Sequence, residues 1–139
     1  MARFTDDYLL YLLAQASAAA SAAFHGELAA QGVPVSTWRI LATLYPDAPA
    51  SIGELAASCL TKQPTMTRQI DRLARAGLVQ RSAATGDRRK VTVSLTQEGR
   101  ALADRLTTMA RAHEARILQG YDAAQAQQVK DVLTGLLTR

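Results

Sequence analysis

The chain has 139 residues, of which 48% are hydrophobic and 20% are charged, and its formal net charge is +4. That length suffices for one domain with a buried core, and the composition excludes a disordered or membrane-spanning chain, because no apolar run approaches the roughly 20 residues that a bilayer requires. The single Cys59 excludes an intramolecular disulfide and a zinc cluster of several thiolates. Because the N-terminal stretch does not resemble a signal peptide, we expect a cytoplasmic protein without a membrane partner. No metal or other cofactor is expected either.

The first third of the sequence predicts two helices. Over residues 5–31, apolar side chains recur at intervals of three and four, which is typical of an amphipathic helix, and Gly32 ends the pattern. A second helix is expected from Ser36 to just before Pro46, since proline lacks the amide hydrogen that would continue the helical hydrogen bonds.

Residues 51–77 have the layout of a helix-turn-helix. Ser51 and Glu54 have the spacing of a capping box, which predicts a short helix through Cys59, and Thr61 is expected to cap the helix that follows. One side of that second helix holds Met66, Ile70 and Leu73, while its other faces hold Gln63, Thr65, Thr67, Arg68, Asp71, Arg72 and Arg75. Gln, Arg and Thr side chains can contact base edges, so we expect this helix to enter the major groove of DNA.

A β-hairpin is expected directly after this module. Residues 78–82 read as a short strand, the triplet at 85–87 favours a turn, and apolar and polar residues alternate over 91–95. The loop between the strands holds three adjacent cations, Arg88, Arg89 and Lys90, which repel one another and gain nothing from the core. We therefore expect a wing that places one arginine in the minor groove and its neighbours against phosphates, with Asp87 holding one arginine as an ion pair.

Positive charge is concentrated around these two elements. Residues 62–90 contain eight basic and two acidic residues, whereas acidic residues slightly outnumber basic ones in the rest of the chain. This distribution is expected of a nucleic-acid contact region on an otherwise near-neutral scaffold. A solvated basic face without a partner is the alternative.

Two further helices are expected at the C-terminal end. Thr96 is expected to cap a helix over about 97–120, and Asp122 and Gln125 repeat the capping-box spacing ahead of a last helix with a strong apolar seam. The expected fold class is therefore mainly α with a small β-hairpin wing. The terminal helices carry more apolar surface than one lobe can cover, which predicts a homodimer; packing of these helices on each other within one subunit is the alternative.

The order and spacing of these motifs resemble the MarR family of bacterial winged helix-turn-helix regulators. The resemblance rests on IGELAASCLTKQPTMTRQIDRLARAGLVQR at 52–81 followed by GDRRKVTVSLTQEGRAL at 86–102. It implies a single domain over 1–139, in which 5–34 and 97–139 supply dimerisation helices and 35–96 form the winged helix-turn-helix lobe. It also implies a transcriptional repressor that binds a palindromic site on double-stranded DNA as a homodimer and is released by a small ligand.

The pattern and the resemblance together nominate the residues that contact DNA. In the comparison, Arg88 is the wing-tip arginine and Asp87 its partner. The expected contacts are Lys62, Gln63, Pro64, Thr65, Thr67, Arg68, Arg72, Asp87, Arg88, Arg89 and Lys90. The sequence departs from the family pattern at Leu60, which replaces a common turn glycine, and at Cys59, which replaces a buried apolar residue.

The resemblance also implies an effector pocket between the dimerisation helices and the lobe, suited to aromatic carboxylates or phenols. It nominates His25, Trp38, Arg39 and His113 by position, with Arg39 pairing a carboxylate and Trp38 stacking on a ring. Alternatively, Trp38 anchors the lobe to the helices and Arg39 faces solvent. For His113, a hydrogen-bonded core or interface histidine is favoured over a ligand contact, because the residue falls on the apolar stripe of its helix.

Other classes of function remain as alternatives. Two histidines and one cysteine at these separations indicate neither a catalytic triad nor a metal site, so the chain is not expected to be an enzyme. Cys59 could make the protein a redox-responsive regulator, although its apolar setting favours packing. A non-specific architectural DNA-binding protein would use the same basic wing without needing a polar recognition helix.

Overall fold

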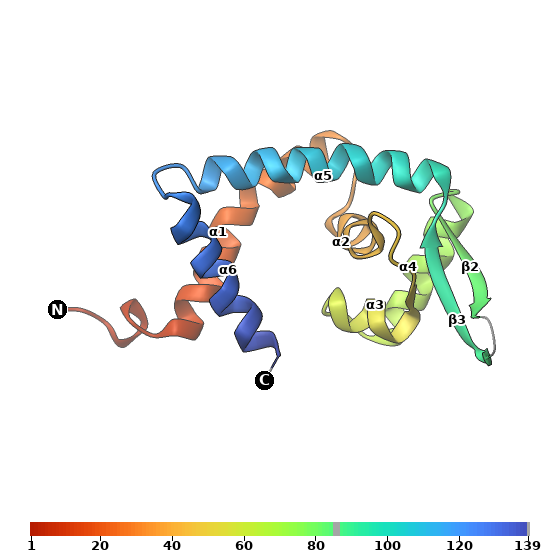
Figure 1. Ribbon diagram of the computed structural model, residues 1–139, viewed down its shortest axis with the longest axis horizontal. Helices are drawn as coiled ribbons and strands as arrows, with labels where there is room; N and C mark the ends of the chain where they lie inside the picture. The colour runs from red at the N-terminus through yellow and green to blue at the C-terminus, as the bar shows by residue number, and fades with distance from the viewer. Residues whose placement is uncertain (85–86, 139) are drawn as a thin grey trace.

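A computed structural model describes the backbone of residues 1–84 and 87–138, and the side chains of 1–82 and 91–138. In chain order the elements are a 3₁₀ turn, η1 (Phe4–Asp6), then α1 (Leu9–Ala30), α2 (Val35–Leu44), β1 (Ala50–Ser51), α3 (Ile52–Ser58), α4 (Gln63–Arg75), β2 (Val79–Ala84), β3 (Asp87–Leu95), α5 (Gln97–Ile117) and α6 (Ala123–Leu137). Helix α5 runs along one edge of the molecule. It connects a lobe formed by α2, α3, α4 and the strands to a separate end where α1 and α6 lie (Figure 1).

The strands form one antiparallel sheet in the order β1-β3-β2. Val79 lies opposite Leu95 and Arg81 opposite Val93, so the hairpin register is regular near its base and shifts only between Ala83 and Ala84. The expected hairpin is thereby confirmed. Strand β1 was not expected, because two residues are too few to show alternation; it pairs with β3 and fastens the start of α3 to the sheet.

The lobe has a hydrophobic core of its own. This core gathers buried side chains from every element of the lobe, including Ile40, Leu44, Leu55, Met66, Ile70, Leu73, Val79 and Val93. A second cluster, with Phe24, Leu28, Leu41 and Leu106 at its centre, joins α1, α2 and α5. Each fully buried side chain of this size contributes about 1.5–3 kcal/mol. Since α2 supplies buried residues to both clusters, it couples the lobe to the long helices.

Side-chain caps explain where α3, α5 and α6 begin, and the observed helix starts correct three expectations. Helix α1 starts at Leu9 rather than Thr5, because the 3₁₀ turn comes first. Lys62 rather than Thr61 occupies the N-cap position of α4, since the turn before this helix runs one residue longer than the threonine suggested. Ser51 accepts a hydrogen bond from the Glu54 amide at 3.1 Å, but the Glu54 carboxylate accepts from the Ser51 hydroxyl instead of completing a reciprocal box. The caps by Thr96 and Asp122 are confirmed.

The turn between α3 and α4 keeps a left-handed residue without glycine. Leu60 has φ of 56° and its side chain is 89% exposed. A leucine in this region of φ and ψ costs roughly 1–2 kcal/mol, because its Cβ crowds the following carbonyl oxygen. Leucine in place of the usual glycine therefore makes the turn less favourable in energy, but the turn keeps its left-handed geometry.

Backbone contact fixes α5 against the lobe. A Cβ added to Gly99, in the first turn of α5, would lie 1.9 Å from the Leu78 carbonyl oxygen, so only glycine allows this approach. The Thr96 hydroxyl also donates to the Gly77 carbonyl at 2.6 Å. The start of α5 is thereby held against the turn that follows α4.

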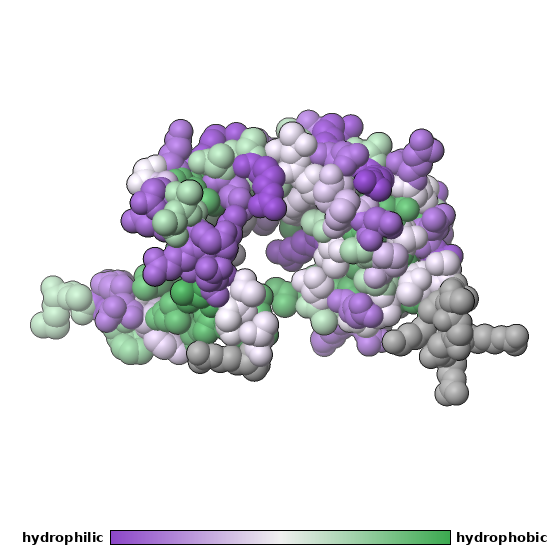
Figure 2. Space-filling view, viewed as in Figure 1, coloured by the Kyte–Doolittle hydropathy of each residue, from purple (hydrophilic) through white to green (hydrophobic). Residues whose placement is uncertain are grey.

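The ends of the chain expose apolar side chains. On α6, Val129, Val132, Leu133 and Leu136 are all exposed, as are Leu9, Leu10, Tyr11 and Leu12 at the start of α1. Figure 2 shows hydrophobic residues gathered at this end of the molecule, away from the lobe. Among the described residues, no helix combines the length and apolar character needed to cross a bilayer. An apolar face of this kind on a polar molecule marks an interaction surface.

Candidate nucleic-acid interface and effector cavity

Helix α4 turns one face to the core and the other to solvent. Met66 and Ile70 have no exposed surface and Leu73 is 4% exposed. The expected DNA contacts on this helix lie on the opposite side, where Gln63, Pro64, Thr67, Arg68 and Arg72 are exposed and Thr65 is half-buried; Lys62, just before the helix, is also exposed. The face that reaches solvent thus carries amide, hydroxyl and guanidinium groups, which are the donors and acceptors that base edges can pair with.

The first turn of α4 is held by local contacts. The Thr67 hydroxyl donates to the Gln63 carbonyl at 3.0 Å, and Arg68 Nη2 donates to Thr65 Oγ1 at 3.4 Å. A Cβ on Gly53 would lie 3.2 Å from Gln63 Nε2, so the Gln63 amide rests against the beginning of α3. The two helices of the helix-turn-helix therefore position the Gln63 side chain together.

An ion pair that the sequence did not reveal joins α4 to the hairpin. The Asp71 carboxylate on α4 accepts a hydrogen bond from Arg81 Nη2 on β2. Their side chains are 42% and 37% exposed, so solvent weakens the attraction and its net contribution to folding is small. The ion pair instead affects the orientation of α4 relative to the hairpin, because it links α4 to the base of the wing.

The cations of the wing lie on β3. Asp87, Arg88, Arg89 and Lys90 belong to this strand rather than to the loop expected from the sequence, because the strands extend further toward the hairpin turn than the alternation over 91–95 indicated. Their side chains, and with them the expected ion pair of Asp87, lie outside the described residues, as do Thr85 and Gly86 of the turn.

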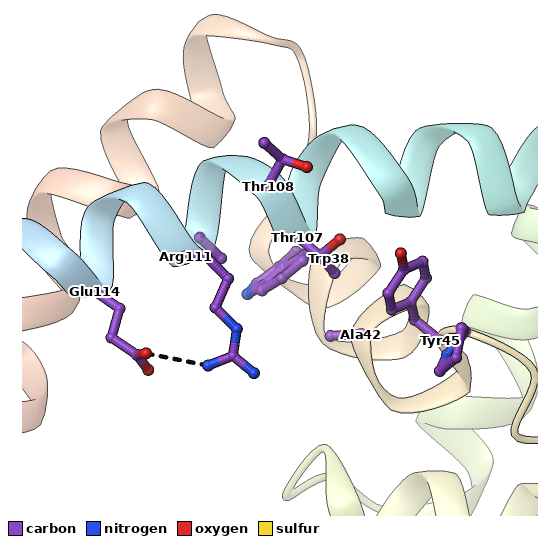
Figure 3. Close-up of a pocket in the computed structure, with 9 residues that line it drawn as sticks. Trp38, Ala42, Tyr45, Thr107, Thr108, Arg111 and Glu114 are labelled. Atoms are coloured by element: carbon purple, nitrogen blue, oxygen red, sulfur yellow. Dashed lines mark hydrogen bonds and ion pairs between the residues drawn. The ribbon is translucent and has the colours of Figure 1, made fainter. Parts of the chain in front are cut away.

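A cavity of about 770 Å³ lies where α2 meets α5. Trp38 and Ala42 line it from α2, with Tyr45 just beyond that helix, and Thr107, Arg111 and Glu114 line it from α5 (Figure 3). The volume is in the range of sites for small organic ligands, and the lining combines aromatic rings with a few polar groups. At one end of the lining, the Tyr45 hydroxyl donates to Asp104 Oδ1 at 2.6 Å.

The four expected effector residues do not converge on one cavity. Trp38 lines the large cavity and also a smaller one of about 250 Å³, which it shares with the exposed Arg39. His113 is buried, its Nε2 lies 2.7 Å from the Ala20 carbonyl oxygen, and its ring stacks against Phe24. His25 is half-buried on α1. The structure therefore favours the reading of His113 as a hydrogen-bonded histidine between α1 and α5.

Sequence reasoning missed Tyr45, Arg111 and Glu114 as cavity residues. Arg111 and Glu114 are exposed or half-buried polar residues on a long helix, where such residues usually face solvent. Only the packing of α5 against α2 brings them to Trp38, which is far away in the sequence. The i, i+3 spacing of Arg111 and Glu114 predicts an ion pair, although it does not indicate a cavity.

Cys59 is packed in the lobe. It is 7% exposed, and the Thr43 hydroxyl lies 3.8 Å from its sulfur. Burial raises the pKa of the Cys59 thiol and outweighs the opposite effects of the Thr43 hydrogen bond and the Arg39 charge. A thiol with a raised pKa carries little of the reactive thiolate at neutral pH, which favours the packing role over redox sensing.

The fold and its surface define a winged helix-turn-helix DNA-binding protein. A short helix, a tight turn, a second helix with a polar outer face and an adjacent antiparallel hairpin form the lobe. The model of the MarR family matches residues 34–91. The homoprotocatechuate degradative operon repressor of Escherichia coli is 31% identical over 127 residues, which are 91% of this chain and 86% of the relative. The chain belongs to the MarR family of transcriptional regulators.

Solved structures support the same assignment over nearly the whole chain. The MarR family transcriptional regulator SPO1453 from Silicibacter pomeroyi DSS-3 is 45% identical, with a TM-score of 0.84 over 98% of this chain and 99% of that one. NadR, in complex with 4-hydroxyphenylacetate, is 25% identical, with a TM-score of 0.87 over 98% of this chain and 96% of the other. The expected fold class, mainly α with a β-hairpin wing, is confirmed.

Proposed function

We propose that the protein is a ligand-responsive transcriptional repressor that binds a palindromic operator as a homodimer in the cytoplasm. The observation that carries the proposal is the division of α4 into a buried face and an exposed face of Gln63, Thr67, Arg68 and Arg72. Such a helix fits the major groove, where paired hydrogen bonds from Gln and Arg distinguish base pairs. Lys62 and the start of the helix would meet phosphates, and Arg88 of the wing would enter the adjacent minor groove.

The homodimer is supported by the apolar end of the molecule. The exposed leucines and valines of α1 and α6 form the surface that a second copy would cover, with segments 5–34 and 97–139 interlocking. A two-fold pair presents two α4 helices, which suits a site with two similar half-sites about one helical turn apart. Both copies then add their contacts to one duplex.

The effector is proposed to be a small aromatic compound bound in the cavity between α2 and α5. Among the relatives, one represses a homoprotocatechuate degradative operon and another is in complex with 4-hydroxyphenylacetate; both compounds are aromatic acids. In this chain, Trp38 and Tyr45 supply aromatic surface on the cavity wall. Because α2 belongs to the cores on both sides, a ligand that binds one arrangement of lobe and helices better than another changes the spacing of the two α4 helices.

The proposal is tested by selecting fragments of the parent genome that the purified protein retains, followed by competition against random duplex. A repressor of this kind retains a small set of fragments with a common palindrome, and an aromatic acid releases them. Equal affinity for all duplexes would instead indicate an architectural DNA-binding protein. Loss of DNA binding on peroxide treatment, absent in a Cys59→Ser variant, would indicate redox control through Cys59.

A further inference from the structure

One threonine side chain joins three elements of the lobe. The Thr96 hydroxyl donates to the Gly77 carbonyl at 2.6 Å, in the turn between α4 and β2, and accepts from the Gly99 amide at 3.0 Å, in the first turn of α5. Thr96 itself is the residue between β3 and α5. The end of the helix proposed to read DNA, the base of the hairpin and the start of α5 therefore meet at this hydroxyl.

Close backbone contact surrounds this hydroxyl. The Leu78 carbonyl accepts from the Thr96 amide at 3.1 Å, and the same oxygen would lie 1.9 Å from a Cβ on Gly99. Gly77, which has φ of 78°, takes the left-handed conformation that ends α4 and turns the chain toward β2. We call Gly77, Leu78, Thr96 and Gly99 the α5 joint. Within it, the Thr96 hydroxyl is the side-chain group that connects the turn to the helix.

A second attachment of α5 to the lobe lies about two turns further along the helix. The Tyr45 hydroxyl donates to Asp104 Oδ1 at 2.6 Å, and Leu106 is buried in one cluster with Leu41 of α2. Two attachments along one helix define its direction relative to the lobe. If the α5 joint is loosened, α5 can pivot about the second attachment.

The length of α5 amplifies a small shift at the α5 joint. Removing the hydroxyl replaces a 2.6 Å hydrogen bond by a van der Waals contact of about 3.6 Å, which is a shift of roughly 1 Å. Thr96 lies about 12 Å before Asp104, and Ile117, at the other end of α5, lies about 20 Å beyond it. The far end of α5 then moves by about 1.7 Å in each copy. In a two-fold pair the two shifts add to about 3 Å, close to the rise of roughly 3.4 Å per base pair.

We propose that Thr96 is a positioning residue that sets the distance between the two α4 helices of the homodimer, and hence the half-site spacing that the protein selects. This inference rests on the proposed binding of a palindromic operator by a homodimer. Thr96 acts through the direction of α5, which leads from the lobe to the end where α1 and α6 lie (Figure 1). Loss of its hydroxyl therefore lowers the preference for one spacing, whereas a single lobe keeps its affinity for a half-site.

Four variants separate positioning from helix capping. Thr96→Val keeps the shape of the side chain and removes both hydrogen bonds, whereas Thr96→Ser keeps the hydroxyl. Thr96→Asp keeps an acceptor for the Gly99 amide, since aspartate is a good N-cap, but its carboxylate offers no donor to the Gly77 carbonyl. Thr107→Val is the matched control, because the partly buried Thr107 hydroxyl donates to the Ala103 carbonyl of its own helix at 2.8 Å.

The measurement is fluorescence anisotropy of the full-length protein with four DNAs. These are the selected palindrome, the same palindrome with one base pair inserted or deleted between its half-sites, and a single half-site. The unmodified protein, Thr96→Ser and Thr107→Val should prefer the selected spacing by at least about tenfold. Thr96→Val and Thr96→Asp should reduce that preference to less than about threefold, and Thr96→Val should bind the half-site within about twofold of the unmodified protein.

A role in capping alone predicts a different result. Thr96→Asp would then keep the full spacing preference, and Thr96→Val would lose affinity by the same factor on every DNA. A spacing preference that survives in Thr96→Val or in Thr96→Asp would overturn the positioning role. If Thr96→Val does not fold, Thr96→Asp, which retains the cap, decides the question. If the unmodified protein itself binds every spacing equally, the palindromic homodimer of the proposed function fails, and the inference fails with it.

Discussion

Asp71 of α4 and Arg81 of β2 form an ion pair that ties the helix proposed to read DNA to the hairpin. The two residues are ten positions apart, on elements that would approach one duplex together under the proposed function. If the pair fixes the angle between them, its loss lowers affinity for DNA without unfolding the lobe.

Asp71→Asn separates this positioning effect from net charge. The substitution adds one positive charge, so simple electrostatics predicts tighter binding, whereas loss of orientation predicts about three- to tenfold weaker binding to the selected operator. The free energy of unfolding should change by less than about 1 kcal/mol, because both side chains are partly exposed. Fluorescence anisotropy with operator DNA measures the affinity. Asp47→Asn, which removes an exposed acid from a loop of the lobe, serves as the charge control.

Arg88→Ala is expected to weaken binding to every duplex. The residue belongs to β3 of the wing, where the account places it in the minor groove, and a buried guanidinium there contributes about 1–3 kcal/mol. Affinity should therefore fall by at least about fivefold on operator and random DNA alike, with the melting temperature unchanged. Unaltered affinity would mean that the wing does not touch DNA.

Gln63→Ala is expected to change which sequences are preferred. The Gln63 amide lies at the start of α4 beside Gly53, where it can reach a base edge, and a lost paired contact costs about 1–3 kcal/mol at one base pair. Repeating the selection with the variant should relax the consensus at one position in each half-site. A uniform loss on all sequences would contradict base readout by this side chain.

Leu60→Gly is expected to stabilise the protein. Leu60 has φ of 56° and is 89% exposed, so glycine relieves backbone strain and gives up little buried surface. The gain of roughly 1–2 kcal/mol is partly offset by the greater freedom of glycine in the unfolded chain, about 0.5–1 kcal/mol, which leaves a net increase near 0.5–1 kcal/mol. Urea unfolding measures it. A loss of stability would show that the leucine side chain packs in the turn.

Periodicity made most of the fold predictable. Met66, Ile70 and Leu73 recur at intervals of four and three, and the structure buries all three, so the sequence placed the correct face of α4 outward. Gly77, with φ of 78°, closes the helix as expected. These features are local, and local spacing is what a sequence displays directly.

The contacts that depend on tertiary packing could not be predicted in the same way. The Asp71–Arg81 pair requires the hairpin to lie at one angle to α4, and the cavity requires Arg111 of α5 to meet Trp38 of α2. The resemblance to the family nominates Arg39 by position to pair with a carboxylate. Arg39 shares only the smaller cavity with Trp38, whereas Arg111, from another helix, lies on the large one.

The central claim is that two copies of this chain present their α4 helices and wings to one symmetric duplex. The most direct test measures affinity and stoichiometry on a selected palindrome, on a single half-site and on random duplex, between 50 and 200 mM salt. The account predicts two chains per palindrome, a clear preference over the half-site and random DNA, and a fall in affinity of about 10³ to 10⁵ across that range if 6–10 phosphates are contacted. One chain per duplex, with the same affinity for all three DNAs, would contradict it.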